Sequence, residues 1–446
     1  MFDFTDSASV HRTLVSMRHL FGMALSLFIM PAMAAPLTLE QAWQIAEQAN
    51  PALRAAQANI GAFEGAVTDA KATLWNNPQL SGGVVRRSIP SSQNANEWNI
   101  GIAQTFELAG QQGFRRAAAQ QELEAVKVGY EETRRQLRAE VEQRFVRVLG
   151  LQSRIDIEVN TIRLIQEASE AVQKRVRVGE DTKLEGNLAS VEVGRANNQI
   201  TMLKEQLIQA KAELATLLQL PPDNLPEVVG DLQGKPADYT LNDLLTSAAN
   251  RAQLKALEHR REAANKRLSL ERAAVYPDVT LGLSAAQEGP SGARENLTGL
   301  SVSIPLPLFR RNASGIGRAM ADLTQTDIEK ATAEREAKAQ VVALWSKLES
   351  MRERVKTLDT MILPSLEENQ RLATKAFKAG EIGLVDLLVV SRQAIDGRRD
   401  GLDALVEFAQ TRVALEQAAG WPNAAAPEKQ DALPETWPKQ VTEQQQ

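Results

Sequence analysis

The second half of this sequence repeats the plan of the first half at a spacing of about 200 residues. Thr38-Leu-Glu-Gln-Ala-Trp-Gln-Ile-Ala recurs in outline as Thr240-Leu-Asn-Asp-Leu-Leu-Thr-Ser-Ala. Far downstream, Arg177-Val-Gly-Glu-Asp-Thr-Lys-Leu-Glu pairs with Lys378-Ala-Gly-Glu-Ile-Gly-Leu-Val-Asp at the same spacing. The alternative is chance similarity between helical sequences, but the constant spacing favours a tandem duplication. Whatever the chain folds into must therefore be built from two similar units.

Each repeat predicts the same order of elements: two helices, two strands, a very long helix, a turn and a long helix. The expected helices are 51–75, 110–178 and 182–218 in the first repeat and 251–275, 311–379 and 384–419 in the second. At 1.5 Å per residue the longest would reach about 100 Å, which no compact core can accommodate. The expected fold is mainly α with a small β part, organised as two long helical hairpins.

The domain boundaries follow from composition and from the repeat. We expect a signal peptide at 1–34, a first repeat at 35–218, a linker at 219–239, a second repeat at 240–420 and a tail at 421–446. The linker is rich in Pro, Gly and Asp, as a connecting loop should be. The tail is rich in Pro and Gln and is expected to be disordered.

The leader has the three-part form of a secretory signal peptide. Arg18 and His19 precede an apolar run from Leu20 to Met30, and Ala32-Met33-Ala34 supplies small residues for cleavage after Ala34. An N-terminal membrane anchor is the alternative, but a span needs about 20 apolar residues. Translation could begin at Met1 or at Met17, because Met1 to Ser16 is a poor n-region. The mature protein is the same in both cases.

Composition excludes several classes of function. The chain has no cysteine, and of its three histidines His11 and His19 lie in the leader, leaving His259 alone. Thiolate chemistry and zinc or histidine-based sites are therefore not expected, and neither a catalytic triad nor a nucleotide-binding loop is present. The net charge of −5 argues against nucleic acid as a partner. We expect no enzyme, no cofactor and no metal site.

Four segments alternate between apolar and small polar residues, as strands do. They lie at about 77–87, 98–106, 277–287 and 298–308. Their length of about ten residues suits a tilted membrane strand, although a half-buried strand of a soluble sheet alternates in the same way. The inward positions carry Ser, Thr, Gly, Ala and Asn, and aromatic residues sit at or near the strand ends. These interfacial aromatics are Trp75, Trp98, Phe106, Tyr276 and Phe309.

Four strands cannot close a membrane barrel. About eight strands are the practical minimum, and an open edge in lipid would leave backbone groups without hydrogen-bond partners. The strands must therefore be pooled between subunits, and three chains would supply twelve.

These features resemble the TolC-type outer-membrane efflux proteins over nearly the whole mature chain. Two segments look most like the outer-membrane component of cobalt–zinc–cadmium efflux systems: Leu39-Glu-Gln-Ala through Asn50-Pro-Ala-Leu-Arg-Ala-Ala, and Leu300-Ser-Val-Ser-Ile-Pro-Leu-Pro-Leu-Phe-Arg-Arg-Asn. The resemblance implies a homotrimer in which a twelve-stranded barrel in outer-membrane lipid continues into a periplasmic α-barrel. It also implies two partners, a periplasmic adaptor of the membrane-fusion type and an inner-membrane resistance–nodulation–division pump.

The family's hairpin tips, which meet the adaptor and close the periplasmic end, match two short segments here. They comprise Val178, Gly179 and Glu180 in the first repeat and Ala379, Gly380 and Glu381 in the second. The acids that follow, Glu185 and Asp386, are expected either to gate the periplasmic aperture or only to begin the return helices near their positive dipole ends.

The tips also depart from the best-known family pattern. Phe377 replaces a tyrosine of the closing bonds, Ile382 an arginine and Val389 a second ring aspartate. The usual locking network is therefore not expected in the same form. Because no cysteine follows the leader, a lipid anchor is not expected either.

The function that best fits is the exit duct of a proton-driven efflux pump for divalent cations such as cobalt, zinc, cadmium or nickel. Two alternatives stay open: a duct for drugs and other organic compounds, or for type I secretion, and a periplasmic adaptor. An adaptor is the weaker alternative because it carries one helical hairpin between strand-rich halves, whereas this chain shows two hairpins. A secreted coiled coil would leave the strands unexplained.

Overall fold

The computed structural model describes residues 36–88, 95–233, 239–290, 292–309 and 311–421. They belong to the unit of the chain that begins at Pro36. The predicted signal peptide lies outside the described residues, as does the predicted tail beyond Trp421.

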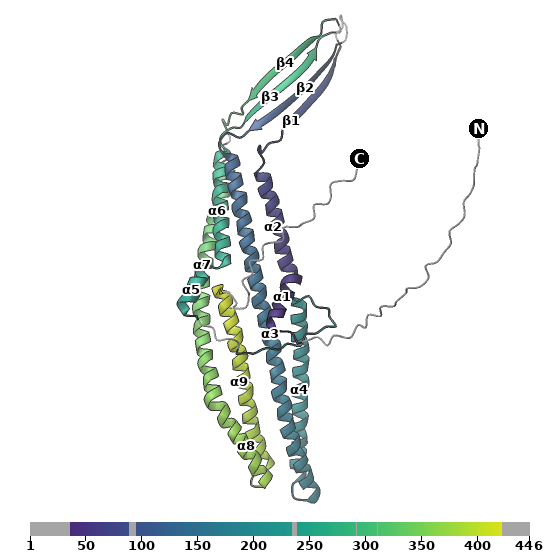
Figure 1. The fold of residues 1–446 in the computed structure, drawn as a ribbon, viewed down its shortest axis with the longest axis vertical. Coiled ribbons are helices and arrows are strands. Elements are labelled where there is room, and N and C mark those ends of the chain that lie inside the picture. The colour runs from purple at the N-terminus through teal and green to yellow at the C-terminus, as the bar shows by residue number, and fades with distance from the viewer. Residues whose placement is uncertain (1–35, 89–94, 234–238, 291, 310, 422–446) are drawn as a thin grey trace, which may run out of the picture. The chain divides into compact units, whose positions relative to one another are not determined.

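The described residues are mostly helical with one small sheet (Figure 1). The first half contains α1 (Leu39–Ala49), α2 (Pro51–Ala70), β1 (Gln79–Arg87), β2 (Ala95–Phe106), α3 (Gln111–Val178) and α4 (Lys183–Leu217). The second half contains α5 (Leu241–Ala249), α6 (Ala252–Ala273), β3 (Val279–Glu288), β4 (Glu295–Ser303), α7 (Ala313–Thr357), the π-helical turn η1 (Leu358–Ile362), α8 (Leu363–Ala379) and α9 (Leu384–Ala419).

The helices begin where local chemistry supplies a cap. The Thr38 and Thr240 hydroxyls each accept a hydrogen bond from the backbone N–H three residues on, and the Gln41 and Asp243 side chains accept one from the backbone N–H of the capping threonine. These capping boxes satisfy amide groups that the first turn of a helix leaves free. The duplicated Thr-Leu motif thus starts α1 and α5 in the same way.

One expected helix is interrupted. The segment 311–379 was expected to be continuous, as α3 is, but the structure divides it at η1 into α7 and α8. Pro364 follows immediately, at the start of α8, where a missing N–H costs an α-helix one of its hydrogen bonds. A π turn inserts one residue into an α-helix and absorbs such a break.

The four strands form one antiparallel sheet in the order β1-β2-β3-β4. Leu283 of β3 lies opposite Ile102 of β2 and Leu300 of β4, so these apolar side chains share a face. The neighbouring positions Gly101, Ser284 and Gly299 align in the same way, so the other face carries small residues. Within the described residues β1 and β4 each pair on one side only.

The fourth strand is shifted from its expected position. It was expected at about 298–308, but β4 occupies Glu295–Ser303 and the sheet does not include Ile304, Leu306 or Leu308. Pro305 and Pro307 explain the end of the strand, because neither has an N–H to donate to a ladder. The strand instead begins earlier, at the turn that joins it to β3.

Helix α3 links the two halves of the fold. It packs against α1, α2 and α4 of its own half and against α6 and α9 of the second half, and Figure 1 shows α4 and α9 on either side of its C-terminal part. A core around Trp43, Val141, Phe145 and Leu214 joins α1, α3 and α4. The Trp43 indole N–H donates to the Arg138 carbonyl at 3.0 Å, so its polar atom is satisfied inside this core.

The linker between the two repeats returns to the start of the described chain, where Leu37 forms a parallel bridge with Val228. None of the helices in the described residues is both long and apolar enough to cross a membrane.

Candidate functional site

The first hairpin tip is a tight turn followed by a capped helix. Gly179, which ends α3, has φ 83°, a left-handed conformation that glycine adopts without strain. Thr182 then caps α4: its hydroxyl accepts from the Glu185 amide at 3.2 Å. The Glu185 carboxylate accepts from the Thr182 amide at 2.9 Å, so this predicted aperture residue is engaged in its own helix cap.

The second tip has the same turn but a looser cap. Gly380 ends α8 with φ 78°, and α9 begins after Gly383. Because glycine has no side chain, only half of a capping box can form: the Gly383 amide donates to the Asp386 carboxylate at 3.4 Å. Asp386 is exposed, as are Glu180 and Glu381. Among the described residues neither Glu185 nor Asp386 has a Lys or Arg ion-pair partner, and each carboxylate accepts a hydrogen bond from the cap of its own helix.

The two hairpins contact each other just above these tips. Val172 of α3 and Ala189 of α4 pack with Phe377, Leu384 and Leu387 of the second hairpin. Phe377, which stands in place of the family's tyrosine, is 4% exposed. It has no hydroxyl to donate, so its side chain contributes packing to the contact between the hairpins.

Polar links across the same contact come from residues that the sequence did not single out. The Arg175 guanidinium lies 5.0 Å from the Phe377 ring centroid and donates to the Phe377 carbonyl at 3.4 Å. Arg392 of α9 pairs with Glu192 of α4 at 2.5 Å. A cationic side chain over an aromatic ring is worth about 0.5–2 kcal/mol depending on exposure. These contacts join the two hairpins just above the tips, and none of them is a side-chain hydrogen bond of Phe377, Ile382 or Val389.

Farther from the tips, α3 and α9 are joined by a buried ion pair. Glu158 of α3 is 2% exposed and accepts two hydrogen bonds from Arg399 of α9, at 2.7 and 2.9 Å. The hydrogen bonds to Glu158 raise the pKa of Arg399. Arg154, one turn from Glu158, reaches across in the same direction and pairs with Asp403 at 3.0 Å. The two helices are thus connected by a charge network as well as by apolar packing.

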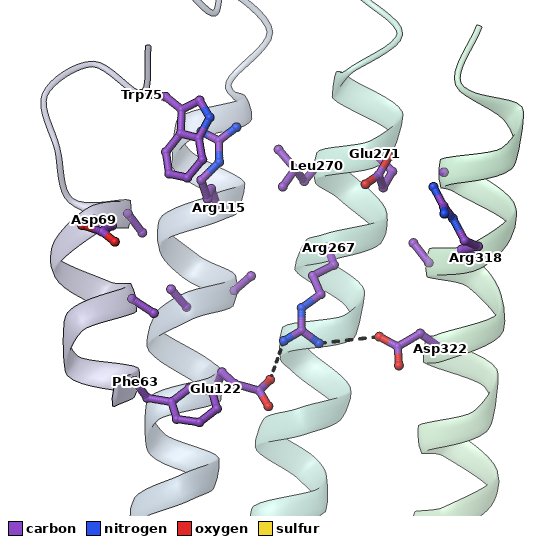
Figure 2. A pocket seen from close by; sticks show the side chains of 16 residues that line it. Phe63, Asp69, Trp75, Arg115, Glu122, Arg267, Leu270, Glu271, Arg318 and Asp322 are labelled. Carbon is purple, nitrogen blue, oxygen red and sulfur yellow. Dashed lines mark hydrogen bonds and ion pairs between the residues drawn. The ribbon is translucent and has the colours of Figure 1, made fainter. Parts of the chain in front are cut away.

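Near the sheet, four helices line a hollow of about 660 Å³ (Figure 2). Its walls come from α2, α3, α6 and α7, and its floor consists largely of alanines such as Ala66, Ala118 and Ala319. Figure 2 shows Arg267 between two carboxylates: it pairs with Glu122 at 2.8 Å and with Asp322 at 3.6 Å.

Two further charged residues of this hollow, Arg115 and Glu271, are also engaged by protein groups. Arg115 stacks on Trp75, 3.9 Å from the ring centroid, and pairs with Glu107 at 2.7 Å. The Glu271 carboxylate accepts from Asn312 at 2.6 Å. In the described part of the chain, no group of three or more His, Asp or Glu side chains is placed to hold a metal ion. Most of the charged side chains that line the hollow are therefore paired or hydrogen-bonded with other protein groups.

The predicted interfacial aromatics divide between two places. Trp75 precedes β1, Phe106 ends β2, Tyr276 precedes β3 and Phe309 follows β4, so these four gather where the sheet joins the helices. Phe309 is 96% exposed, the most exposed large apolar side chain among the described residues. Trp98 instead pairs with Val84 and Gln287 in the other half of the sheet.

Comparison with known proteins identifies the family. The model of the outer membrane efflux protein family matches residues 42–219 and 245–421, well over half of the chain. The cobalt-zinc-cadmium resistance protein CzcC of Cupriavidus metallidurans is 27% identical over 87% of this chain and 91% of its own length. The nickel-cobalt-cadmium resistance protein NccC of Alcaligenes xylosoxydans xylosoxydans is 25% identical over 61% of this chain and 64% of its own.

Among solved structures, the outer membrane protein VceC of Vibrio cholerae superposes with a TM-score of 0.71 at 18% identity, covering 86% of this chain and 96% of that one. At this identity the likeness shows the fold. Together with the family match it confirms the resemblance to TolC-type proteins. The chain therefore belongs to the outer membrane efflux protein family and is an efflux channel of the outer membrane.

Proposed function

We propose that this protein is the exit duct of a tripartite efflux pump and that it works as a homotrimer. The observation that supports this most directly is the sheet, whose two outer strands pair on one side only and whose exposed apolar face carries Leu80, Ile102, Leu283 and Leu300. Three copies would pool twelve strands into a closed barrel in outer-membrane lipid, which satisfies both edges. The paired helices would continue this barrel into the periplasm.

The same proposal fixes the organisation of the chain. Residues 1–34 are an export signal, 35–218 and 240–420 are the two repeats joined by the linker 219–239, and 421–446 are a periplasmic tail. The apolar strand faces, with Trp75, Trp98, Phe106, Tyr276 and Phe309, contact lipid and its interface. A periplasmic adaptor and an inner-membrane proton-driven pump complete the assembly. The duct catalyses no reaction.

The cargo we propose is a divalent heavy-metal cation such as cobalt, zinc, cadmium or nickel. Support comes from CzcC and NccC, both of which are metal-resistance proteins, and CzcC aligns over nearly the whole mature chain. The paired charges of the helical hollow agree with a wall that passes cations without holding them. Selectivity would then reside in the pump.

Deletion of the protein is expected to sensitise its host to these metals, because a pump without an exit duct cannot clear them from the cell. Growth inhibition by zinc, cobalt, cadmium and nickel salts is the measurement, with complementation by the intact gene as control. Unchanged tolerance to all four metals, with increased sensitivity to organic compounds, would instead favour the organic-compound duct.

We propose that the tips dock the adaptor and form the aperture. Val178, Gly179, Glu180, Ala379, Gly380 and Glu381 lie at the two turns, and Glu185 and Asp386 follow them. In a trimer the last two would contribute six carboxylates around one mouth. The helix caps that these acids form are compatible with this role, since each cap uses only one oxygen of the carboxylate, Oε2 of Glu185 and Oδ2 of Asp386.

Replacing Glu185 and Asp386 together by alanine is expected to raise single-channel conductance in planar bilayers, because the narrow end loses both side-chain bulk and negative charge. Thr182→Ala is the matched control, since it weakens the first helix cap without removing an acid. If the control raises conductance as much as the double variant does, the acids act only as caps.

A further inference from the structure

A second buried charge cluster, distinct from the ion pair at Glu158, lies where the linker, α3, α5 and the end of α9 meet. Glu142 of α3 is 4% exposed and Glu416 of α9 is 8% exposed. Arg412 of α9 donates to the Glu142 carboxylate at 3.2 Å. The Tyr239 hydroxyl donates to the Glu416 carboxylate at 3.3 Å. Arg412 is thus hydrogen-bonded to one of the two buried carboxylates, Glu142, while Glu416 has the Tyr239 hydroxyl as its partner.

Two other cations at the end of α9 are engaged elsewhere. Arg135 of α3 donates to the Gln417 carbonyl and pairs with Glu132 at 2.6 Å, and Arg251 donates to the Ala418 carbonyl at 3.3 Å. Around Glu142, the other charged groups within reach are Arg412 and Glu416 on α9 and Glu40 on α1. Around Tyr239 the further cation is Arg352 of α7, whose side chain is half exposed. Arg412 itself is not fully used, because its buried Nε–H has no hydrogen-bond partner among the described residues. The cluster therefore carries a buried excess of negative charge when both acids are ionised.

Glu158 shows what a balanced arrangement looks like in the same pair of helices. It too is a buried carboxylate of α3 facing α9, but two arginines face it, Arg399 at 2.7 Å and Arg154 at 3.6 Å. An uncompensated buried charge costs several kcal/mol, and taking up a proton is the least costly way for a carboxylate to remove it. Glu158 therefore has two arginines to compensate its charge, whereas Glu142 has one.

We infer that Glu142, Glu416, Arg412 and Tyr239 form a buried proton-binding site that controls how tightly the end of α9 and the linker dock on α3. With one proton bound, the charges of the cluster balance across the α3–α9 contact. With the proton released, Glu142 on α3 and Glu416 on α9 repel each other across that contact. On the Glu416 side of the cluster, the ring of Tyr239 contacts Trp345 and Trp421. The core around Leu244 and Leu415 lies on the same side.

The direction of the pH effect follows from the same groups. Burial raises the pKa of Glu142 to about 7 and also raises the pKa of Glu416. Burial and the neighbouring Glu416 raise the pKa of Tyr239, so its hydroxyl stays protonated. A carboxyl group whose pKa is higher in the folded than in the unfolded state binds more protons when folded, so folding stability falls as pH rises. Folding stability therefore decreases between about pH 4.5, the ordinary pKa of a glutamate, and about pH 7, the pKa of Glu142 in the folded chain. Above that pH the contribution of this group is fully lost.

The test is hydrogen exchange of the full chain in detergent at several pH values, corrected for the intrinsic exchange rate. Amides of 239–249 and 412–421 are expected to lose protection by about tenfold or more between about pH 5 and about pH 8. Glu142→Gln, which mimics the protonated acid, is expected to retain protection throughout. Glu158→Gln is the matched control and should keep the wild-type pH dependence at these segments.

A second measurement detects the proton directly. In infrared difference spectra between the same pH values, the wild type should show the carbonyl band of a protonated carboxylic acid at the lower pH, and Glu142→Gln or Glu416→Gln should reduce it. Equal protection of the wild type at both pH values, or an unchanged carbonyl band in both variants, would overturn the proposal. If Glu142→Gln does not fold, the wild-type exchange profile and Glu416→Gln decide between these outcomes.

Discussion

Arginine in place of Leu283 is expected to abolish stable insertion of the protein in the outer membrane. Leu283 is 61% exposed in the middle of β3, on the face that carries Ile102 and Leu300. An arginine on the lipid face of a membrane strand costs about 2–4 kcal/mol at the bilayer midplane. In a trimer that cost is incurred three times, which is comparable to the whole stability of a typical folded domain.

The measurement is the amount of protein in outer-membrane fractions and its heat-modifiable migration in gels. Ser284→Arg is the matched control, because Ser284 is the next residue of the same strand and its side chain points to the opposite, small-residue face. We expect Leu283→Arg to be lost from the membrane while Ser284→Arg is retained. Equal recovery of the two variants would contradict the assignment of the lipid face.

Alanine in place of Arg399 is expected to destabilise the contact between the two hairpins more than any exposed ion-pair change does. It removes both hydrogen bonds to Glu158 and leaves that buried carboxylate with Arg154 at 3.6 Å. Breaking a buried pair by removing one partner costs about 3–5 kcal/mol, since the remaining charge is uncompensated. Limited proteolysis and thermal unfolding in detergent measure the effect.

Two variants sharpen this test. Arg371→Ala removes the same side chain from an exposed pair with Glu368, and a solvated pair contributes little, so stability should hardly change. Adding Glu158→Gln to Arg399→Ala removes the stranded charge and should recover much of the loss. If Arg371→Ala and Arg399→Ala are equally mild, the buried pair does not hold the hairpins together.

The sequence predicts best those parts of the fold that depend on local chemistry. The long helices and their turns could be located because Gly179 and Gly380 stand at the two points where the chain must reverse. Three strands were placed within a few residues from their alternation. The fourth was misplaced because Leu306 and Leu308 continue the apolar alternation, whereas Pro305 and Pro307 prevent the hydrogen bonding.

The ionic contacts of the site could not be predicted in the same way. Glu142 and Arg412 are 270 residues apart in sequence, and Glu158 and Arg399 are 241 apart, so their pairing depends on how α9 packs against α3. A signal did exist for Glu142, since it lies within an apolar stripe beside Val141 and Phe145. A lone carboxylate on such a stripe indicates a buried partner, but periodicity does not say which partner it is.

Helix α3 and the α7–η1–α8 segment occupy equivalent places in the two repeats. They differ in the rotation of one end relative to the other about the helix axis. In an uninterrupted helix, every side chain has a fixed angular position relative to the first turn. The one extra residue of a π turn rotates everything beyond it by about 100°, which is the angle per residue of an α-helix. The face that buries Phe377 against the first hairpin is therefore set independently of the faces that α7 presents to α6 and α9. The π turn thus gives the second repeat its own rotational phase near Gly380, and two copies of one sequence plan present different faces at their two tips.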